Sequence, residues 1–520
     1  MRRGRRVIDP RTPVVIGVGQ VTERVDDADY RALSPVDLAA EAVQHAVADS
    51  GADPAALAAA IDTIVATRQF EISVPNAPAP LGKSNNFPRS VARRVGADPA
   101  RAVLDKVGGQ GPQALLTEFA AAIAADTAEV VVLCGSDATS TTRHFAPGDD
   151  GALPAGAPDF HETVDGPLDD RGFGLEEFVD RYTISHGLTG APVQYGLLEN
   201  ARRARVGLTP AAYLQAMGEL FAPFTAVAAR NPLSASPVRR TVDDLVTIST
   251  GNRMICDPYP RLLVARDQVN QGAAVVVASA GAARRLGVPE DNWVFLHGHA
   301  DLREQQLLDR PDLGRSPAAV AAVTEALAVA GIGLDDVAAL DLYSCFPIPV
   351  FNICDAFGLS GADPRGLTLT GGLPFFGGAG NNYSMHAIAE AVAVARRRRG
   401  EFALVGANGG MMSKYSVGVY ATTPTGWRPD ASRRVQDSLD AAPTVPVTET
   451  AEGPATIETY SVRYDWPTRT GIVIGRLGDG TRFLATSEDE DLVALLCEGD
   501  PLGAAITVRA LDYGNRCSLR

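Results

Sequence analysis

The chain repeats one pattern of helix and strand in its first half and again in its second half. Residues 34–51 and 316–331 each begin with Ser-Pro and continue as an alanine- and valine-rich stretch, which is typical of a helix with proline in its first turn. A run of strand length follows each of them, at 61–68 and 334–346. Strands that alternate with amphipathic helices predict parallel sheets flanked by helices, and a repeat of this length indicates a duplicated half-domain.

Each copy continues with a glycine-rich turn, a helix and an apolar strand. The stretch GGQGPQALLTEFAAAI and the strand VVVLCGSDA, within 108–138, correspond to GGAGNNYSMHAIAEAVAV and EFALVGANGG, within 377–410. A turn that leads directly into a helix points backbone N–H groups and the positive end of the helix dipole at one spot, where a thiolate or an oxyanion is stabilised. The first turn is therefore suited to hold a nucleophile, but Gly108, Gly109 and Gln110 offer none.

This turn resembles the catalytic turn of the thiolase family. Thiolases usually carry Cys-Gly-Ser-Gly-hydrophobic-Gln-Ala there, and the cysteine takes the acyl group. The present chain keeps the glycines, Gln113 and Ala114, but Gly108 stands at the position of the cysteine. Acyl transfer to a side chain at this position is impossible. The resemblance implies an α/β fold in which two thiolase-like halves pack in a layered αβαβα arrangement.

Two further thiolase positions also lack a reactive side chain. The resemblance places a histidine at Gly378 and a second cysteine at Gly406 or Ala407. A third loop keeps Cys345 and Phe346 of the family's His-Asp-Cys-Phe sequence but neither its His nor its Asp. The resemblance therefore implies that ordinary thiolysis and Claisen condensation do not take place.

Cys345 and His386 are the candidates for a different catalytic pair. Cys345 ends a predicted strand, where α/β folds place catalytic groups, and His386 begins the helix after the asparagine turn. A cysteine beside an imidazole can form a thiolate and accept an acyl group, whereas a buried thiol and a core histidine are the structural alternatives. The predicted pocket around the pair comprises Gly108, Gly109, Gln110, Tyr343, Ser344, Phe346, Gly378, Asn381, Asn382, Ala407 and Asn408.

The chain divides into five predicted parts. The thiolase-like halves are 1–144 and 263–424, and the segment 145–262 between them resembles the loop domain that thiolases insert over the CoA-binding region. Residues 425–455 are rich in Pro, Thr and charge and are predicted to form a linker. Short β-like runs in 456–520 predict a small closed antiparallel barrel. A thiolase fold joined to such a barrel resembles the family called thiolase-like protein type 1.

Composition excludes several classes of partner. The net charge of −15 excludes a nucleic-acid partner, and no apolar run is long enough to span a membrane. The six cysteines form no CxxC pair, so neither a disulfide framework nor a metal site is predicted, and the reducing cytoplasm is the expected compartment.

The resemblance implies a pocket for a coenzyme A thioester or a lipid-like small molecule, with no cofactor required. Two functions stay open. One is an acyltransferase of the thiolase superfamily that uses non-standard residues, and the other is a catalytically inactive acyl- or lipid-binding or scaffold protein. The barrel is a possible surface for a protein partner, and we expect a monomer or a dimer.

Overall fold

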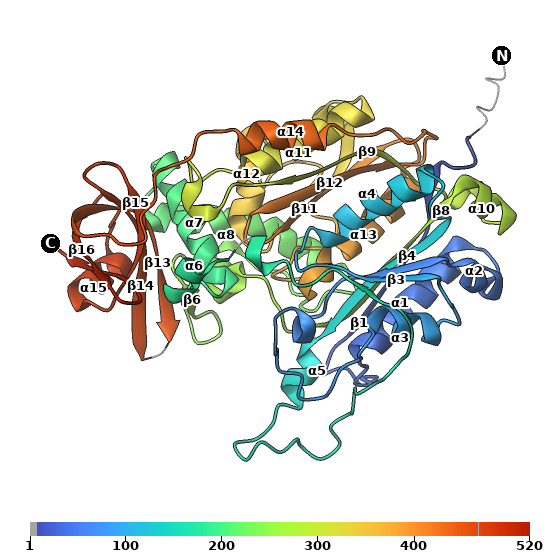
Figure 1. The fold of residues 1–520 in the computed structure, drawn as a ribbon, viewed down its shortest axis with the longest axis horizontal. Coiled ribbons are helices and arrows are strands. Elements are labelled where there is room, and N and C mark those ends of the chain that lie inside the picture. The colour runs from blue at the N-terminus through green and yellow to red at the C-terminus, as the bar shows by residue number, and fades with distance from the viewer. Residues whose placement is uncertain (1–7, 178, 466) are drawn as a thin grey trace.

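Two β-sheets, each covered by helices, carry most of the chain, and a small barrel lies at its C-terminal end (Figure 1). The computed structural model describes residues 8–177, 179–465 and 467–520. The first seven residues of the predicted first half therefore lie outside the described residues.

The first sheet contains a strand from beyond the inserted segment. Its strands lie in the order β1 (Pro13–Glu23), β8 (Asn270–Ser279), β4 (Val130–Ala138), β2 (Thr63–Ala66), β3 (Arg101–Leu104) and β5 (Asp169–Asp170). Every residue of β4 and β8 is buried, and the apolar runs VVVLC in β4 and AAVVVA in β8 suit strands that are covered on both faces. β8 pairs antiparallel with β1 and β4, although the predicted boundary at residue 263 assigns it to the second half. The later part of the chain thus completes the sheet of the earlier part.

The second sheet and the helices around it give the molecule five layers. Its strands lie in the order β10 (Val337–Leu342), β11 (Phe402–Gly409), β12 (Lys414–Ala421) and β9 (Phe295–Arg303). Helices α4 (Gly111–Ala124) and α13 (Tyr383–Arg397) lie between the two sheets and contact both. Helix α1 (Pro35–Ser50) covers the other face of the first sheet, and α11 (Pro317–Ala330) covers that of the second. The predicted αβαβα arrangement is confirmed.

Matching caps explain why the two Ser-Pro sequences begin helices. Ser34 Oγ accepts a hydrogen bond from the backbone N–H of Asp37 in α1, and Ser316 Oγ accepts one from Ala319 in α11. Proline then occupies the first turn of each helix, where its missing N–H has no partner to lose. Both helices end at a glycine in the left-handed region, Gly51 and Gly331.

The remaining elements surround this frame. The helices are α2 (Pro54–Ala60), α3 (Phe87–Arg94), α5 (Thr139–His144), α6 (Arg181–Ser185), α7 (Ala191–Val206), α8 (Pro210–Ala228), α9 (Val242–Val246), α10 (Ala280–Arg285), α12 (Pro347–Phe357), α14 (Ser432–Asp440) and α15 (Glu490–Glu498). Short 3-10 helices are η1 (Phe70–Ile72), η2 (Leu175–Glu177), η3 (Arg261–Leu263), η4 (Glu290–Asn292), η5 (Leu307–Asp309), η6 (Leu334–Asp336) and η7 (Gly380–Asn382). Two short strands, β6 (Met254–Cys256) and β7 (Tyr259–Pro260), end the inserted segment.

The C-terminal strands close on themselves. In ring order they are β13 (Gly453–Asp465), β14 (Thr468–Leu477), β15 (Arg482–Ser487), β17 (Gly514–Leu519) and β16 (Ala505–Leu511), and β16 returns to β13. The β15–β17 pairing is parallel and the other pairings in the ring are antiparallel. The predicted closed barrel is confirmed. The segment 425–455, predicted to be a linker, contains α14, which packs on α11 and β9.

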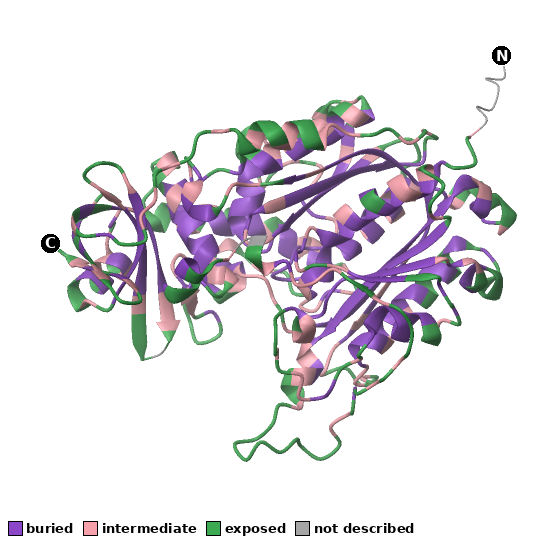
Figure 2. Cartoon of the chain, in the orientation of Figure 1, coloured by how far each residue is buried: buried purple, intermediate pink, exposed green. Residues whose placement is uncertain are grey.

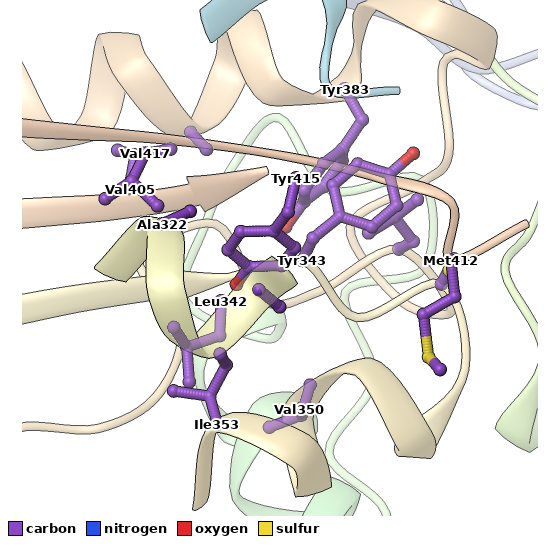
Figure 3. Close-up of a cluster of buried hydrophobic side chains, with 14 of the residues drawn as sticks. Ala322, Leu342, Tyr343, Val350, Ile353, Tyr383, Val405, Met412, Tyr415 and Val417 are labelled. Atoms are coloured by element: carbon purple, nitrogen blue, oxygen red, sulfur yellow. The ribbon is translucent and has the colours of Figure 1, made fainter. Parts of the chain in front are cut away.

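Buried residues follow both sheets, the helices between them and the helices of the inserted segment (Figure 2). One apolar cluster joins the second sheet to α11 and α12, with Tyr343, Tyr383 and Tyr415 among its large side chains (Figure 3). In this cluster Tyr343 directly follows β10, and Met412 lies in the turn between β11 and β12. No helix in the described ranges is long and apolar enough to cross a membrane.

Candidate ligand-binding site

A pocket of about 880 Å³ opens where the two halves and the inserted segment meet. Of the residues predicted from the sequence, those that line it are Gly108, Gly109, Tyr343, Cys345, Phe346, Gly378, Asn381 and Asn408. They come from the turn before α4, the ends of β10 and β11 and the turns before α12 and α13. The repeated turns of the two halves therefore face one shared space.

Asn381 fixes the position of the turn at 108–110, which carries no nucleophile. Its Oδ1 accepts a hydrogen bond of 2.9 Å from the backbone N–H of Gly108, and its Nδ2 donates to the Arg68 carbonyl at 2.8 Å. Gly108 has a φ of 155°, which favours glycine. A side-chain contact between the two halves thus holds the turn in its conformation.

Cys345 lies in the pocket wall as a buried thiol. It directly precedes Phe346, the N-cap residue of α12, and its Sγ lies 3.8 Å from Asn408 Nδ2. Burial raises the pKa of the Cys345 thiol to about 12, although hydrogen bonds from Tyr195, Phe346 and Asn408 counteract the shift. The thiol is therefore protonated near neutral pH.

His386 lies on α13 away from the lining of the pocket. Its Nδ1 is 2.8 Å from Gln20 Oε1 on β1, and its ring meets the ring of Phe376 edge to face. Burial lowers the pKa of His386 to about 3, so the ring is neutral. Within the described part of the chain, no hydrogen bond joins His386 to Cys345.

The other predicted residues lie behind the pocket wall. Ser344 Oγ accepts a hydrogen bond from the Leu373 N–H, and Asn382 Nδ2 donates to the Gly135 carbonyl. Ala407 is buried in β11, where it pairs with Ser416 of β12. Gln110 is the N-cap residue of α4 and does not line the pocket. These residues support the site rather than face a ligand.

Tyr195 of α7 is a pocket residue that the sequence analysis missed. Its hydroxyl oxygen accepts hydrogen bonds from Asn408 Nδ2 at 2.7 Å and from the Met412 N–H at 2.9 Å. Its ring stacks on Phe346 with the ring centres 4.3 Å apart. The inserted segment lies outside the repeat, so no periodicity in the sequence relates this tyrosine to the turns of the two halves.

Four arginines also line the pocket: Arg240, Arg253, Arg261 and Arg266. Two of them are exposed and two are half-buried, whereas the tyrosine, cysteine and asparagine side chains of the wall are buried. None of the four forms an ion pair with a carboxylate of the described residues. Two carboxylates, Asp244 and Asp267, also line the pocket, and Asp244 forms the capping box of α9 with Thr241. The outer part of the pocket is therefore rich in guanidinium groups without a carboxylate partner.

No group of His, Cys, Asp or Glu side chains in the described ranges could hold a metal ion. The six cysteines are free thiols. The pocket offers hydrogen-bond donors, guanidinium groups and apolar walls. Among the residues that line it, Cys345 is the one with a thiol.

Comparison with known proteins gives matches to one family and to solved structures. The family described as the thiolase-like protein type 1 additional C-terminal domain matches residues 434–512. The crystal structure of a monomeric SCP2-thiolase like protein type 1 from Mycobacterium smegmatis is 56% identical over 99% of this chain and 100% of that chain, with a TM-score of 0.85. No curated protein matches the chain.

Two more distant structures share the fold. The Ltp2-ChsH2(DUF35) aldolase is 20% identical, with a TM-score of 0.56, over 80% of this chain and 99% of that chain. Human mitochondrial 3-ketoacyl-CoA thiolase is 16% identical, with a TM-score of 0.52, over 80% of this chain and 100% of that chain. At these identities the similarity extends to the arrangement of helices and strands.

Proposed function

Because the chain belongs to the family of SCP2-thiolase like proteins type 1, we propose that its pocket binds the coenzyme A thioester of an acyl chain and does not perform thiolase chemistry. The observation that carries this proposal is the change in character along the pocket, from unpaired guanidinium groups on the outside to buried aromatic and apolar side chains within.

Each part of the pocket suits one part of such a ligand. The planar guanidinium of arginine matches phosphate oxygens, and coenzyme A carries phosphates at the end opposite its thioester. Phe346, Leu373 and Phe375 supply apolar wall, which suits an acyl chain. Unpaired arginines around one pocket are a local reversal of charge in a protein with a net charge of −15, and they favour an anionic ligand.

The same geometry argues against thiolysis. Neither Gly108 nor Gly378 can supply the nucleophile or the imidazole that a thiolase uses at these positions. Cys345 is protonated and has no imidazole partner among the described residues. Binding without turnover by the usual mechanism is therefore the function that the site supports best.

One observation favours a second candidate, self-acylation of Cys345. This thiol lines the pocket at the start of α12, where Asn408 and the Phe346 N–H approach it. In that reaction Sγ would attack the thioester carbonyl and the bond from the carbonyl to the coenzyme A sulfur would break. The cysteine proton would leave with coenzyme A as the free thiol. The product is a new thioester on the protein.

Titration calorimetry with butyryl-CoA tests the binding function. We expect the double variant Arg253→Ala/Arg261→Ala to raise Kd about tenfold or more, because a hydrogen bond to a charged group contributes about 1.5–3 kcal/mol. Arg239→Ala is the matched control, since Arg239 is exposed in the same segment but does not line the pocket. No binding, or an equal effect of the control, contradicts the proposal.

Intact mass after incubation with butyryl-CoA separates the two candidates. An unchanged mass together with tight binding supports the binding function alone. A butyryl adduct that disappears in Cys345→Ala supports self-acylation, whereas an adduct that persists in this variant excludes Cys345 as its site.

A further inference from the structure

The Tyr343 hydroxyl is a polar group of the pocket wall without a partner in the protein. Tyr343 directly follows β10, lines the pocket and is 7% exposed. Its ring packs edge to face on the ring of Tyr383, with the ring centres 5.3 Å apart (Figure 3). Among the described residues, no hydrogen bond reaches its hydroxyl. A buried tyrosine hydroxyl usually has a partner, so this group lacks a contact that its burial calls for.

The tyrosines around it differ from Tyr343 in this respect. Tyr195 accepts two hydrogen bonds, and the Tyr383 hydroxyl lies 2.6 Å from Thr370 Oγ1. The Tyr415 hydroxyl also has no partner among the described residues, but it is fully buried and its residue does not line the pocket. Tyr343 therefore combines an unpartnered hydroxyl with a place in the lining.

Gly109 leaves the space that this hydroxyl occupies. A Cβ atom added at Gly109 would collide with Tyr343 Oη. Gly109 lines the pocket too, so the hydroxyl stands beside the turn at 108–110. The backbone N–H of Gly108 in this turn donates to Asn381 Oδ1 and is not available to a ligand.

The side-chain amides of the same wall already serve the protein. Asn381 Nδ2 donates to two protein oxygen atoms. Asn408 Nδ2 donates to the Tyr195 hydroxyl and to Cys345 Sγ. Unlike these two amides, Tyr343 has a polar proton that no described protein group accepts.

The hydroxyl can act as a donor to an uncharged group. Burial raises the pKa of Tyr343 well above its ordinary value, and the nearby Cys345 adds to this rise, so the phenol keeps its proton near neutral pH. The guanidinium groups lie on the more exposed part of the pocket, whereas Tyr343 belongs to its buried part. Phosphate groups suit the exposed part, and a neutral oxygen suits the hydroxyl.

We propose that Tyr343 determines the specificity of this pocket: its hydroxyl donates to the carbonyl oxygen of the bound thioester, so that the pocket selects acyl thioesters over other derivatives of coenzyme A. This inference rests on the proposed function of acyl-CoA binding. A site built to hydrogen-bond a ligand group discriminates against the analogue that lacks it, because the buried partner is then left unpaired.

Calorimetry with butyryl-CoA and its thioether analogue S-butyl-CoA tests the inference, because the two ligands differ only in the carbonyl group. We expect butyryl-CoA to bind the wild-type protein about tenfold more tightly. Tyr343→Phe keeps the ring and removes the hydroxyl, so this preference should disappear while S-butyl-CoA binds as before. Tyr415→Phe is the matched control, because it removes an unpartnered hydroxyl away from the lining, and it should keep the preference.

Infrared spectroscopy of butyryl-CoA labelled with ¹³C at the thioester carbonyl gives a second readout. A hydrogen bond from the phenol lowers the carbonyl stretching frequency. We therefore expect a lower frequency for the ligand bound to the wild-type protein than for the ligand bound to Tyr343→Phe. The same frequency in both proteins overturns the inference.

The affinities distinguish this inference from the function on which it rests. Equal affinity of the wild-type protein for the two ligands overturns the inference and leaves the binding function standing. A preference that persists in Tyr343→Phe, including an equal loss of affinity for both ligands, also overturns it. Failure of both ligands to bind the wild-type protein overturns the inference and the function together.

Discussion

At the scale of single residues, the two glycines at thiolase catalytic positions differ in the space around them. A Cβ atom at Gly378 would lie 3.3 Å from the Arg266 carbonyl oxygen and farther from its other neighbours. A Cβ atom at Gly108 would collide with Gln110 and would require a φ of 155°. A methyl group at Gly378 would therefore make one tight contact, whereas at Gly108 the end of the Gln110 side chain would have to move and the backbone conformation would be strained.

This difference predicts unequal costs for two small substitutions. We expect Gly108→Ala to lower the free energy of unfolding by about 1–3 kcal/mol, because it adds a collision to a backbone conformation that disfavours side chains. Gly378→Ala should cost less than about 1 kcal/mol. Urea denaturation measures both. The double variant Gly108→Ala/Gln110→Ala should recover part of the loss, and a larger cost for Gly378→Ala than for Gly108→Ala would contradict this account.

Which pocket residues the sequence could predict depended on backbone position. Gly108, Cys345 and Asn408 follow from it, because turns and strand ends of the repeated halves meet at one edge of the sheets. The direction of the His386 side chain could not be predicted in this way, because α13 lies between two sheets and is buried on both sides. An apolar pattern without an exposed face cannot tell which neighbour a helical residue contacts, and His386 contacts Gln20.

At the scale of secondary-structure elements, the outer edge of the first sheet is covered by the inserted segment. β5 pairs with β3, and the Arg171 N–H donates to the Leu104 carbonyl. Arg101 pairs with Asp169 at 2.7 Å, and Arg171 pairs with Glu118 at 2.6 Å. An open strand edge is a template for pairing with another chain, so this cover favours a monomer.

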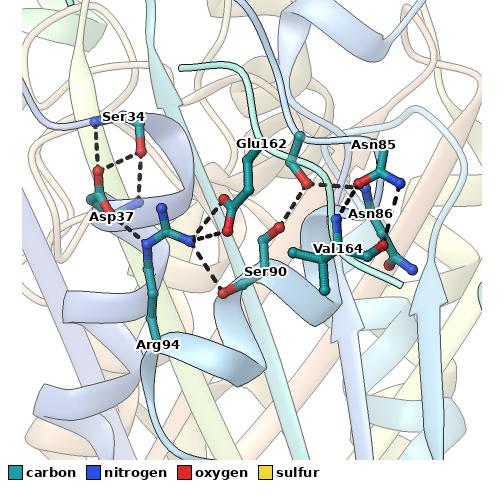
Figure 4. Close-up of polar contacts among 9 residues, drawn as sticks. Ser34, Asp37, Asn85, Asn86, Ser90, Arg94, Glu162 and Val164 are labelled. Atoms are coloured by element: carbon teal, nitrogen blue, oxygen red, sulfur yellow. Dashed lines mark hydrogen bonds and ion pairs between the residues drawn. The ribbon is translucent and has the colours of Figure 1, made fainter. Parts of the chain in front are cut away.

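The same segment is attached a second time, before it reaches β5. The Arg94 guanidinium bridges Asp37 of α1 and Glu162 of the segment, and Asn85 exchanges hydrogen bonds with the backbone of Val164 (Figure 4). The similar protein from Mycobacterium smegmatis is described as monomeric. In the present chain, the two attachments hold the inserted segment against the first sheet and α1.

Releasing β5 should therefore expose β3. We expect Arg101→Ala/Arg171→Ala to speed amide hydrogen exchange in 101–104 and to produce dimers or larger species at high concentration. Hydrogen exchange with mass spectrometry and light scattering measure the two effects. Arg94→Ala removes ion pairs from the other attachment and should leave exchange in β3 unchanged. A strictly monomeric double variant with unchanged exchange would show that β5 does not protect the edge.

At the scale of the whole molecule, buried polar groups join the barrel to the second half, and the barrel's sequence does not indicate that these groups are buried. Arg482 on β15 is fully buried, and its Nη1 donates to the carbonyls of Leu308 and Arg310 in the second half, both at 2.6 Å. Its other nitrogens bind Glu458 of β13. Within the run TRFLATS this arginine resembles any exposed residue of a strand, so the sequence predicted the barrel but not how it docks.

Arg476 offers a matched comparison, because it binds the same carboxylate from a partly exposed position. Arg482→Met leaves two buried carbonyls without their donor and should cost about 3–5 kcal/mol, whereas Arg476→Met should cost about 0–1 kcal/mol. Since the lost contacts join the barrel to the second half, we expect calorimetry of Arg482→Met to resolve a separate transition at lower temperature. The Arg476→Met protein should unfold in the same way as the wild-type protein. Equal shifts in the two variants, with no separate transition, would mean that the buried arginine stabilises the barrel itself and not its attachment.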